Sequence, residues 1–129
     1  MVSGVEHVAI AARDSRRLIE WYCDVLGMRV VFDNGKEPPT CLVGGTTGAV
    51  LEIMPDNGSA AADHQPLDPG IRHIAFRVAD MAAAHAALQG RVLGLTPPGP
   101  AAGGGQIAFF HDLEGNLVQL VSRERDILS

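Results

Sequence analysis

The chain has 129 residues, of which 47% are hydrophobic and 19% are charged, and its formal net charge is -5 at pH 7. This length predicts a single domain over residues 1–129, and the acidic balance gives no electrostatic reason to bind nucleic acid or a membrane surface. No apolar run approaches the roughly 20 residues that cross a bilayer, and the first residues lack the pattern of a secretion signal.

The first predicted strand belongs to a segment that recurs later in the chain. Residues 4–10 read GVEHVAI and residues 70–76 read GIRHIAF, at an offset of 66 residues. A second match joins GAVLEI at 48–53 to GNLVQL at 115–120, at an offset of 67 residues. Because the two offsets nearly agree, they indicate one internal duplication.

A helix follows the first strand in each half. Asp14 is expected to cap the first helix, and Gly27 to end it in the left-handed conformation. Asp80 and Gly90 bracket the second helix in the same way. Cys23 falls in the first helix and Cys41 in a strand; two cysteines without a spaced framework predict reduced thiols and a cytoplasmic protein.

Three short strands are expected after each helix, bounded by turn residues. They lie at 28–32, 40–43 and 49–54 in the first half, and at 92–95, 106–110 and 117–121 in the second. The order predicts an α+β fold of two tandem βαβββ modules that form a curved mixed sheet around a cleft. Module one covers about 4–55, a connection covers about 56–69, and module two covers about 70–122.

Four polar side chains are predicted on the strand faces turned away from the helices. By alternation His7 shares a face with Ala9, whereas Ile10 faces the helix. Each module then offers one imidazole on its first strand and one oxygen donor on its last. Two modules paired about a pseudo-twofold axis would bring these side chains together: His7, Glu52, His73 and Gln119.

A metal ion is the predicted partner of this set. An ionised Glu52 buried among apolar residues costs several kcal/mol unless it is paired, and no Lys or Arg is expected on the inward face of the four strands. Taken singly, a strand histidine is more often a packed core residue, but recurrence at matched positions favours ligands. Two imidazoles, one carboxylate and one amide suit one divalent Zn, Ni, Co, Mn or Fe ion better than Ca or Mg.

The strand before Gln119 supplies two further candidates. Phe109 and His111 share a face by alternation and are predicted to contact substrate. The alternative for His111 is a solvent-exposed position at the end of a hairpin.

These motifs resemble the vicinal oxygen chelate superfamily, which includes glyoxalase I, methylmalonyl-CoA epimerase, extradiol dioxygenases, and fosfomycin- and bleomycin-resistance proteins. The resemblance covers nearly the whole chain and rests on HVAI, RHIAF, the WY and VLGM motifs at 21–28, AVLEIM, and FHDLEGNLVQL at 110–120. It implies a glyoxalase-like fold, metal ligands at the four positions above, a small-molecule substrate and a homodimer.

The resemblance also implies a reaction class. With the predicted donors it favours a divalent-metal-dependent lyase or isomerase that acts next to a carbonyl through an enediolate, with Glu52 as the base. The alternatives are a metal-free protein that binds a drug or toxin, and an extradiol-type dioxygenase. Gln119 stands where bacterial glyoxalase I has a glutamate, and Ala11 and Asp56 replace the Arg and Asn that contact glutathione, so glutathione is not the expected cosubstrate.

Overall fold

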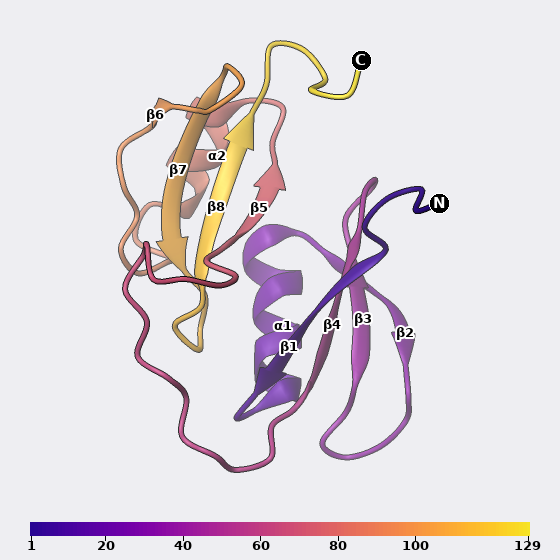
Figure 1. The fold of residues 1–129 in the computed structure, drawn as a ribbon. Coiled ribbons are helices and arrows are strands. Elements are labelled where there is room, and N and C mark those ends of the chain that lie inside the picture. The colour runs from indigo at the N-terminus through magenta and orange to yellow at the C-terminus, as the bar shows by residue number, and fades with distance from the viewer. The chain divides into compact units, whose positions relative to one another are not determined.

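The computed structural model describes residues 1–129, which divide into two compact units, Met1–Ala62 (unit one) and Asp63–Ser129 (unit two). Each unit contains one helix and one four-stranded mixed sheet, as Figure 1 shows. The α+β fold with two βαβββ modules is therefore confirmed. Neither helix is long and apolar enough to cross a membrane.

Unit one has the order strand, helix and three strands. Its elements are β1 (His7–Ala12), α1 (Ser15–Leu26), β2 (Arg29–Asp33), β3 (Cys41–Gly44) and β4 (Val50–Pro55). The strands lie in the order β1-β4-β3-β2; β1 is parallel to β4, and the other neighbours are antiparallel. The parallel pair brings the first and last strands of the unit side by side (Figure 1).

Helix α1 begins and ends where the sequence predicts. The Asp14 side chain accepts a hydrogen bond from the backbone N–H of Arg17, and Gly27 adopts a left-handed φ of 68°. The helix packs against the sheet through a buried face that includes Leu18 and Tyr22. On the sheet, Ile53 belongs to the buried face that packs with them.

Unit two repeats this arrangement. Its elements are β5 (Ile74–Arg77), α2 (Met81–Leu88), β6 (Gly99–Pro100), β7 (Gln106–His111) and β8 (Leu117–Ser122). The order is β5-β8-β7-β6, again with the first and last strands parallel and the other neighbours antiparallel. Asp80 caps α2 by accepting a hydrogen bond from the backbone N–H of Ala83.

The strand predicted at 92–95 is wrong. That segment makes one isolated bridge, between Leu93 and His111, and the strand beside β7 is β6, at 99–100. The reason is Gly94, whose φ of 71° is left-handed and cannot continue a strand. A Cβ at Gly94 would lie 2.9 Å from Nδ1 of His111, so a larger residue there would also displace that ring.

Strand β2 forms the outer edge of the first sheet. All five of its residues are exposed. Its pairing with β3 shifts between Val30 and Phe32, which leaves Val31 as the extra residue of a β-bulge. The edge of this sheet is therefore irregular.

Candidate functional site

The first pair of predicted donors lies on the open face of unit one. Across the parallel ladder His7 is paired with Val50, and Ala9 with Glu52, so His7 and Glu52 project from the same face of adjacent strands. Ile10 alternates to the opposite face and is buried there. His7 is exposed and Glu52 is partly exposed, which corrects the expectation that Glu52 is buried among apolar side chains.

The imidazole of His7 is bonded to the neighbouring residue in the chain. Its Nδ1 lies against the carboxylate of Glu6. This hydrogen bond and the charge of Glu6 raise the pKa of His7, and the charge of Glu52 adds to the effect. With Nδ1–H donating to the carboxylate, Nε2 carries the free lone pair that a metal ion requires.

The second pair lies on the corresponding face of unit two. Ala75 pairs with Gln119 across the parallel ladder, and His73, two residues before Ala75, alternates to the same face. Gln119 is also paired with Phe109 of β7. The rings of His73 and Phe109 meet edge to face, with centroids 5.3 Å apart. His73, Phe109 and Gln119 thus form one cluster.

His111 continues this face at the end of β7. It pairs with Leu117 and is exposed, and its backbone N–H donates to the carbonyl of Leu93. Phe109 and His111 therefore share a face, as alternation predicts, but Phe109 alone contacts one of the predicted donors.

The four predicted donors thus come as two pairs, one in each unit. Neither unit by itself gathers three or more His, Cys, Asp or Glu side chains around one point. Each pair combines an imidazole nitrogen with a side-chain oxygen. Because each pair contains an imidazole nitrogen, its donor chemistry suits a first-row divalent ion better than an alkaline-earth ion.

Arg77 is a charged residue on the open face that the sequence reasoning missed. Strand β5 continues one residue beyond the segment first matched, and Arg77 pairs with Val121 on the same face as Ala75. The expectation that no Lys or Arg occupies the inward faces is therefore wrong. Extending the alternation of His73 and Ala75 by one more step would have found it.

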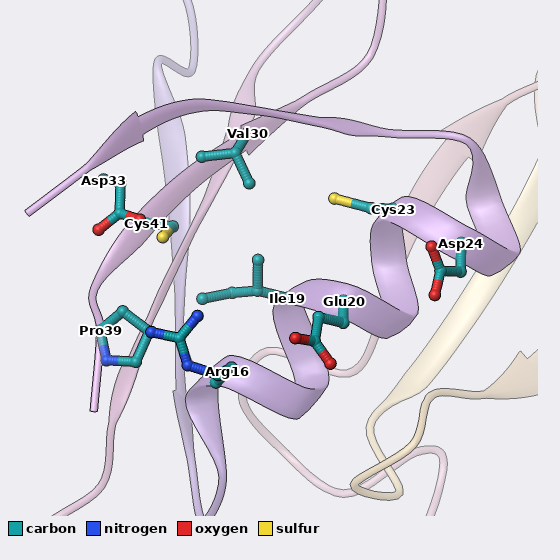
Figure 2. Close-up of a pocket in the computed structure, with 9 residues that line it drawn as sticks. All are labelled: Arg16, Ile19, Glu20, Cys23, Asp24, Val30, Asp33, Pro39 and Cys41. Atoms are coloured by element: carbon teal, nitrogen blue, oxygen red, sulfur yellow. The ribbon is translucent and has the colours of Figure 1, made fainter. Parts of the chain in front are cut away.

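A cavity of about 190 Å³ lies on the other side of the first sheet, between α1 and strands β2 and β3 (Figure 2). Cys23 and Cys41 both line it, and both thiols are free. Burial is the main cause that raises the pKa of each thiol, and the charge of Asp24 adds to it at Cys23, that of Asp33 at Cys41. Cys41 is on the buried face of the sheet, so the cavity is separate from His7 and Glu52.

The whole pattern of elements and motifs matches one protein family. A model of the Glyoxalase/Bleomycin resistance protein/Dioxygenase superfamily matches residues 4–120. The chain belongs to this superfamily. A search of curated proteins gives no match.

Several solved structures of the superfamily share the fold. A glyoxylase/bleomycin resistance protein/dioxygenase domain from Frankia sp. EAN1pec is 20% identical with a TM-score of 0.75, covering 96% of this chain and 100% of that one. Lactoylglutathione lyase from Agrobacterium tumefaciens is 20% identical with a TM-score of 0.66, covering 94% of each chain. TnmS3, an antibiotic binding protein from Streptomyces sp. CB03234, is 22% identical with a TM-score of 0.66, covering 95% of this chain and 98% of that one. The superfamily fold thus occurs in a lyase and in a binding protein.

Proposed function

We propose that the protein is a divalent-metal-dependent enzyme of the glyoxalase type, a lyase or isomerase that acts on a small molecule next to a carbonyl group. His7, Glu52, His73 and Gln119 are the proposed ligands of one Zn, Ni, Co, Mn or Fe ion. The proposal includes a homodimer located in the cytoplasm.

One observation carries the proposal. The imidazole and the carboxylate of unit one project from the same face of β1 and β4, and unit two repeats that placement with an imidazole at the residue before β5 and an amide on β8. A chance pairing of polar residues in strands would not recur at matched positions in both copies of a duplication. The bond from His7 to Glu6 also supports it, because carboxylates commonly orient metal-binding imidazoles in this way.

The protein's own residues define the chemistry at this site. When bound, the ion supplies a Lewis acid that stabilises negative charge on substrate oxygens. Glu52 is the only carboxylate in β1 and β4, so we assign it the proton transfer. On a 2-hydroxy carbonyl substrate Glu52 would take the proton from the hydroxyl-bearing carbon and return it to the former carbonyl carbon, while the hydroxyl proton would pass from one substrate oxygen to the other. Gln119 cannot share this work, since an amide does not accept a proton at neutral pH.

The open face of unit two supplies the proposed substrate contacts. Phe109 is partly buried beside Gln119 and offers an aromatic surface, and His111 lies at the exposed end of the same strand. In this assignment Phe109 packs against the carbon skeleton of the substrate, and His111 donates a hydrogen bond at its outer end.

Metal analysis tests the proposal. Protein purified without chelator should contain about one first-row ion per chain, and His7→Ala and His73→Ala should each lose it. His64→Ala, in the segment of unit two that precedes β5, is the matched control and should retain the ion. Persistent absence of metal after reconstitution would overturn the proposal. A Glu52→Gln variant that keeps both the metal and full turnover would exclude Glu52 as the base.

The second candidate is a metal-free protein that binds a drug or toxin. This candidate is supported by the partly exposed apolar side chains on the open faces, which include Leu42, Met54 and Phe109. Metal content separates the two functions, because a binding protein of this kind would retain its ligand after His7→Ala. A turnover screen over 1,2-dicarbonyls and 2-hydroxy ketones then identifies the enzyme.

A further inference from the structure

We infer that the ligand of the proposed site carries an anionic oxygen group, a carboxylate or a phosphate, and that Arg77 binds it. The inference rests on the proposed function, because it concerns the ligand of the same site. It restricts the ligand to small molecules that carry two adjacent oxygen atoms and, in addition, a separate anionic group.

The placement of Arg77 is the first support. Along β5 the residues that face the open side are Ala75 and Arg77, and His73, directly before the strand, continues the same alternation. Ala75 lies opposite Gln119, so Arg77 lies two residues beyond the level of Gln119 and four residues beyond His73. Two residues of strand span about 7 Å, a distance that a small ligand can bridge.

Arg77 also lacks a partner within the protein. The side chain is exposed and makes no hydrogen bond or ion pair. Other arginines do have partners within the protein: Arg16 binds Glu37, and Arg72 and Arg123 donate to backbone carbonyls. The guanidinium of Arg77 therefore retains its full set of donors for a ligand.

The charge of this face selects for an anion. Strands β5, β7 and β8 contain no Asp or Glu. The ionisable side chains on their open face are His73, Arg77 and His111, none of which carries negative charge, although the chain as a whole has a net charge of -5. Their neighbours Phe109 and Val121 are apolar. A guanidinium in such surroundings favours a carboxylate or phosphate, which it can bind with two parallel hydrogen bonds.

The test compares chelating ligands that differ only in their outer arm. Acetohydroxamate offers two adjacent oxygens and no charge beyond them, succinate monohydroxamate adds a carboxylate, and phosphonoacetohydroxamate adds a phosphonate. Each is titrated into the Co²⁺-loaded full-length protein, and the dissociation constant is read from the visible absorption of the ion. The proteins are wild type, Arg77→Gln, Arg77→Lys and, as the control, Arg17→Gln, which changes an exposed arginine of α1.

The expected result is a loss of affinity specific to the charged arms. Arg77→Gln should lower the affinity for succinate monohydroxamate or phosphonoacetohydroxamate about tenfold. The affinity for acetohydroxamate should not change. Arg77→Lys should recover part of the loss, and Arg17→Gln should match wild type. A larger loss for succinate monohydroxamate would indicate a carboxylate ligand, and a larger loss for phosphonoacetohydroxamate would indicate a phosphate ligand.

Two outcomes overturn the inference, and they are distinguishable. If acetohydroxamate binds but Arg77→Gln leaves the affinity of both charged ligands unchanged, the role of Arg77 is wrong and the proposed function stands. If acetohydroxamate shows no Co²⁺-dependent binding to wild type, the proposed function is wrong, and the inference that rests on it fails with it.

Discussion

The imidazole of His73 meets the ring of Phe109 edge to face, with the ring planes at 87° and the centroids 5.3 Å apart. Aromatic pairs of this geometry contribute about 0.5–1.5 kcal/mol beyond the area that they bury. The contact therefore favours one orientation of the imidazole before any ligand arrives. We classify Phe109 as a residue that positions His73.

Phe109→Ala should weaken Zn²⁺ binding about three- to tenfold, because the imidazole must then be ordered when the ion binds. Isothermal titration of the metal-free protein with Zn²⁺ measures the change. Phe32→Ala is the control, since Phe32 is an exposed ring on β2 that contacts no histidine. Equal Zn²⁺ affinity in wild type and Phe109→Ala would show that the contact does not position His73.

Glu6→Gln should lower the pKa of His7. In wild type the hydrogen bond and the charge of Glu6 hold that pKa above the usual 6.5, and the amide removes the charge. NMR titration of the imidazole protons in the metal-free protein measures both values, and Glu124→Gln, in the C-terminal segment, should leave them unchanged.

The raised pKa of His7 also sets the direction of a pH effect on stability. A group whose pKa is higher in the folded state stabilises the fold fully below its unfolded pKa, and this contribution is lost as pH rises through the folded pKa. The difference in unfolding free energy between wild type and Glu6→Gln should therefore shrink as the pH is raised from 6 to 9. A difference that grew with pH would contradict the assigned bond.

Asp112 organises the turn that leads into β8. Its side chain is 3% exposed and accepts hydrogen bonds from the backbone N–H groups of Glu114 and Asn116, and from the Asn116 amide. Asp112→Ala should lower the unfolding free energy by about 2–4 kcal/mol, because it leaves these donors without an acceptor. Urea unfolding measures this loss, with Asp63→Ala as the control. A loss no larger than that of the control would refute the role of the turn.

Gly105 and Gly99 form a matched pair around the β6–β7 hairpin. A Cβ at Gly105 would lie 1.9 Å from the backbone oxygen of Ser122, and its φ of 94° is left-handed, whereas a Cβ at Gly99 meets nothing within 4 Å. Gly105→Ala should therefore destabilise the protein by about 2 kcal/mol or more, and Gly99→Ala by less than about 0.5 kcal/mol. Thermal unfolding of both variants tests the contrast.

The order of the elements could be predicted because the signals are local and occur twice. Asp14 and Asp80 mark the helix starts through hydrogen bonds that span three residues. Alternation predicts the faces of the strands, since it depends on strand geometry and not on the partner strand. The error at 92–95 shows the limit, because apolar composition favoured a strand where Gly94 takes a left-handed conformation.

The shared strand face of each polar pair could be predicted, but its surroundings could not. The sequence places His7 and Glu52 on strands, and only the parallel ladder with Ala9 opposite Glu52 shows that they are neighbours. Arg77 was missed because the repeat ends one residue earlier, at Phe76. The contact between His73 and Phe109 joins residues 36 positions apart in the numbering, and no local pattern reports such a contact.

The bulge at Val31 affects how the protein behaves at high concentration. An exposed strand that carries Val30, Val31 and Phe32 has the composition that recruits further strands into fibres. The extra residue breaks the regular spacing of the backbone N–H and C=O groups along the outer edge of β2. An incoming strand therefore cannot form a continuous hydrogen-bond ladder with it. The one-residue bulge thus opposes the pairing of β2 with strands of other molecules.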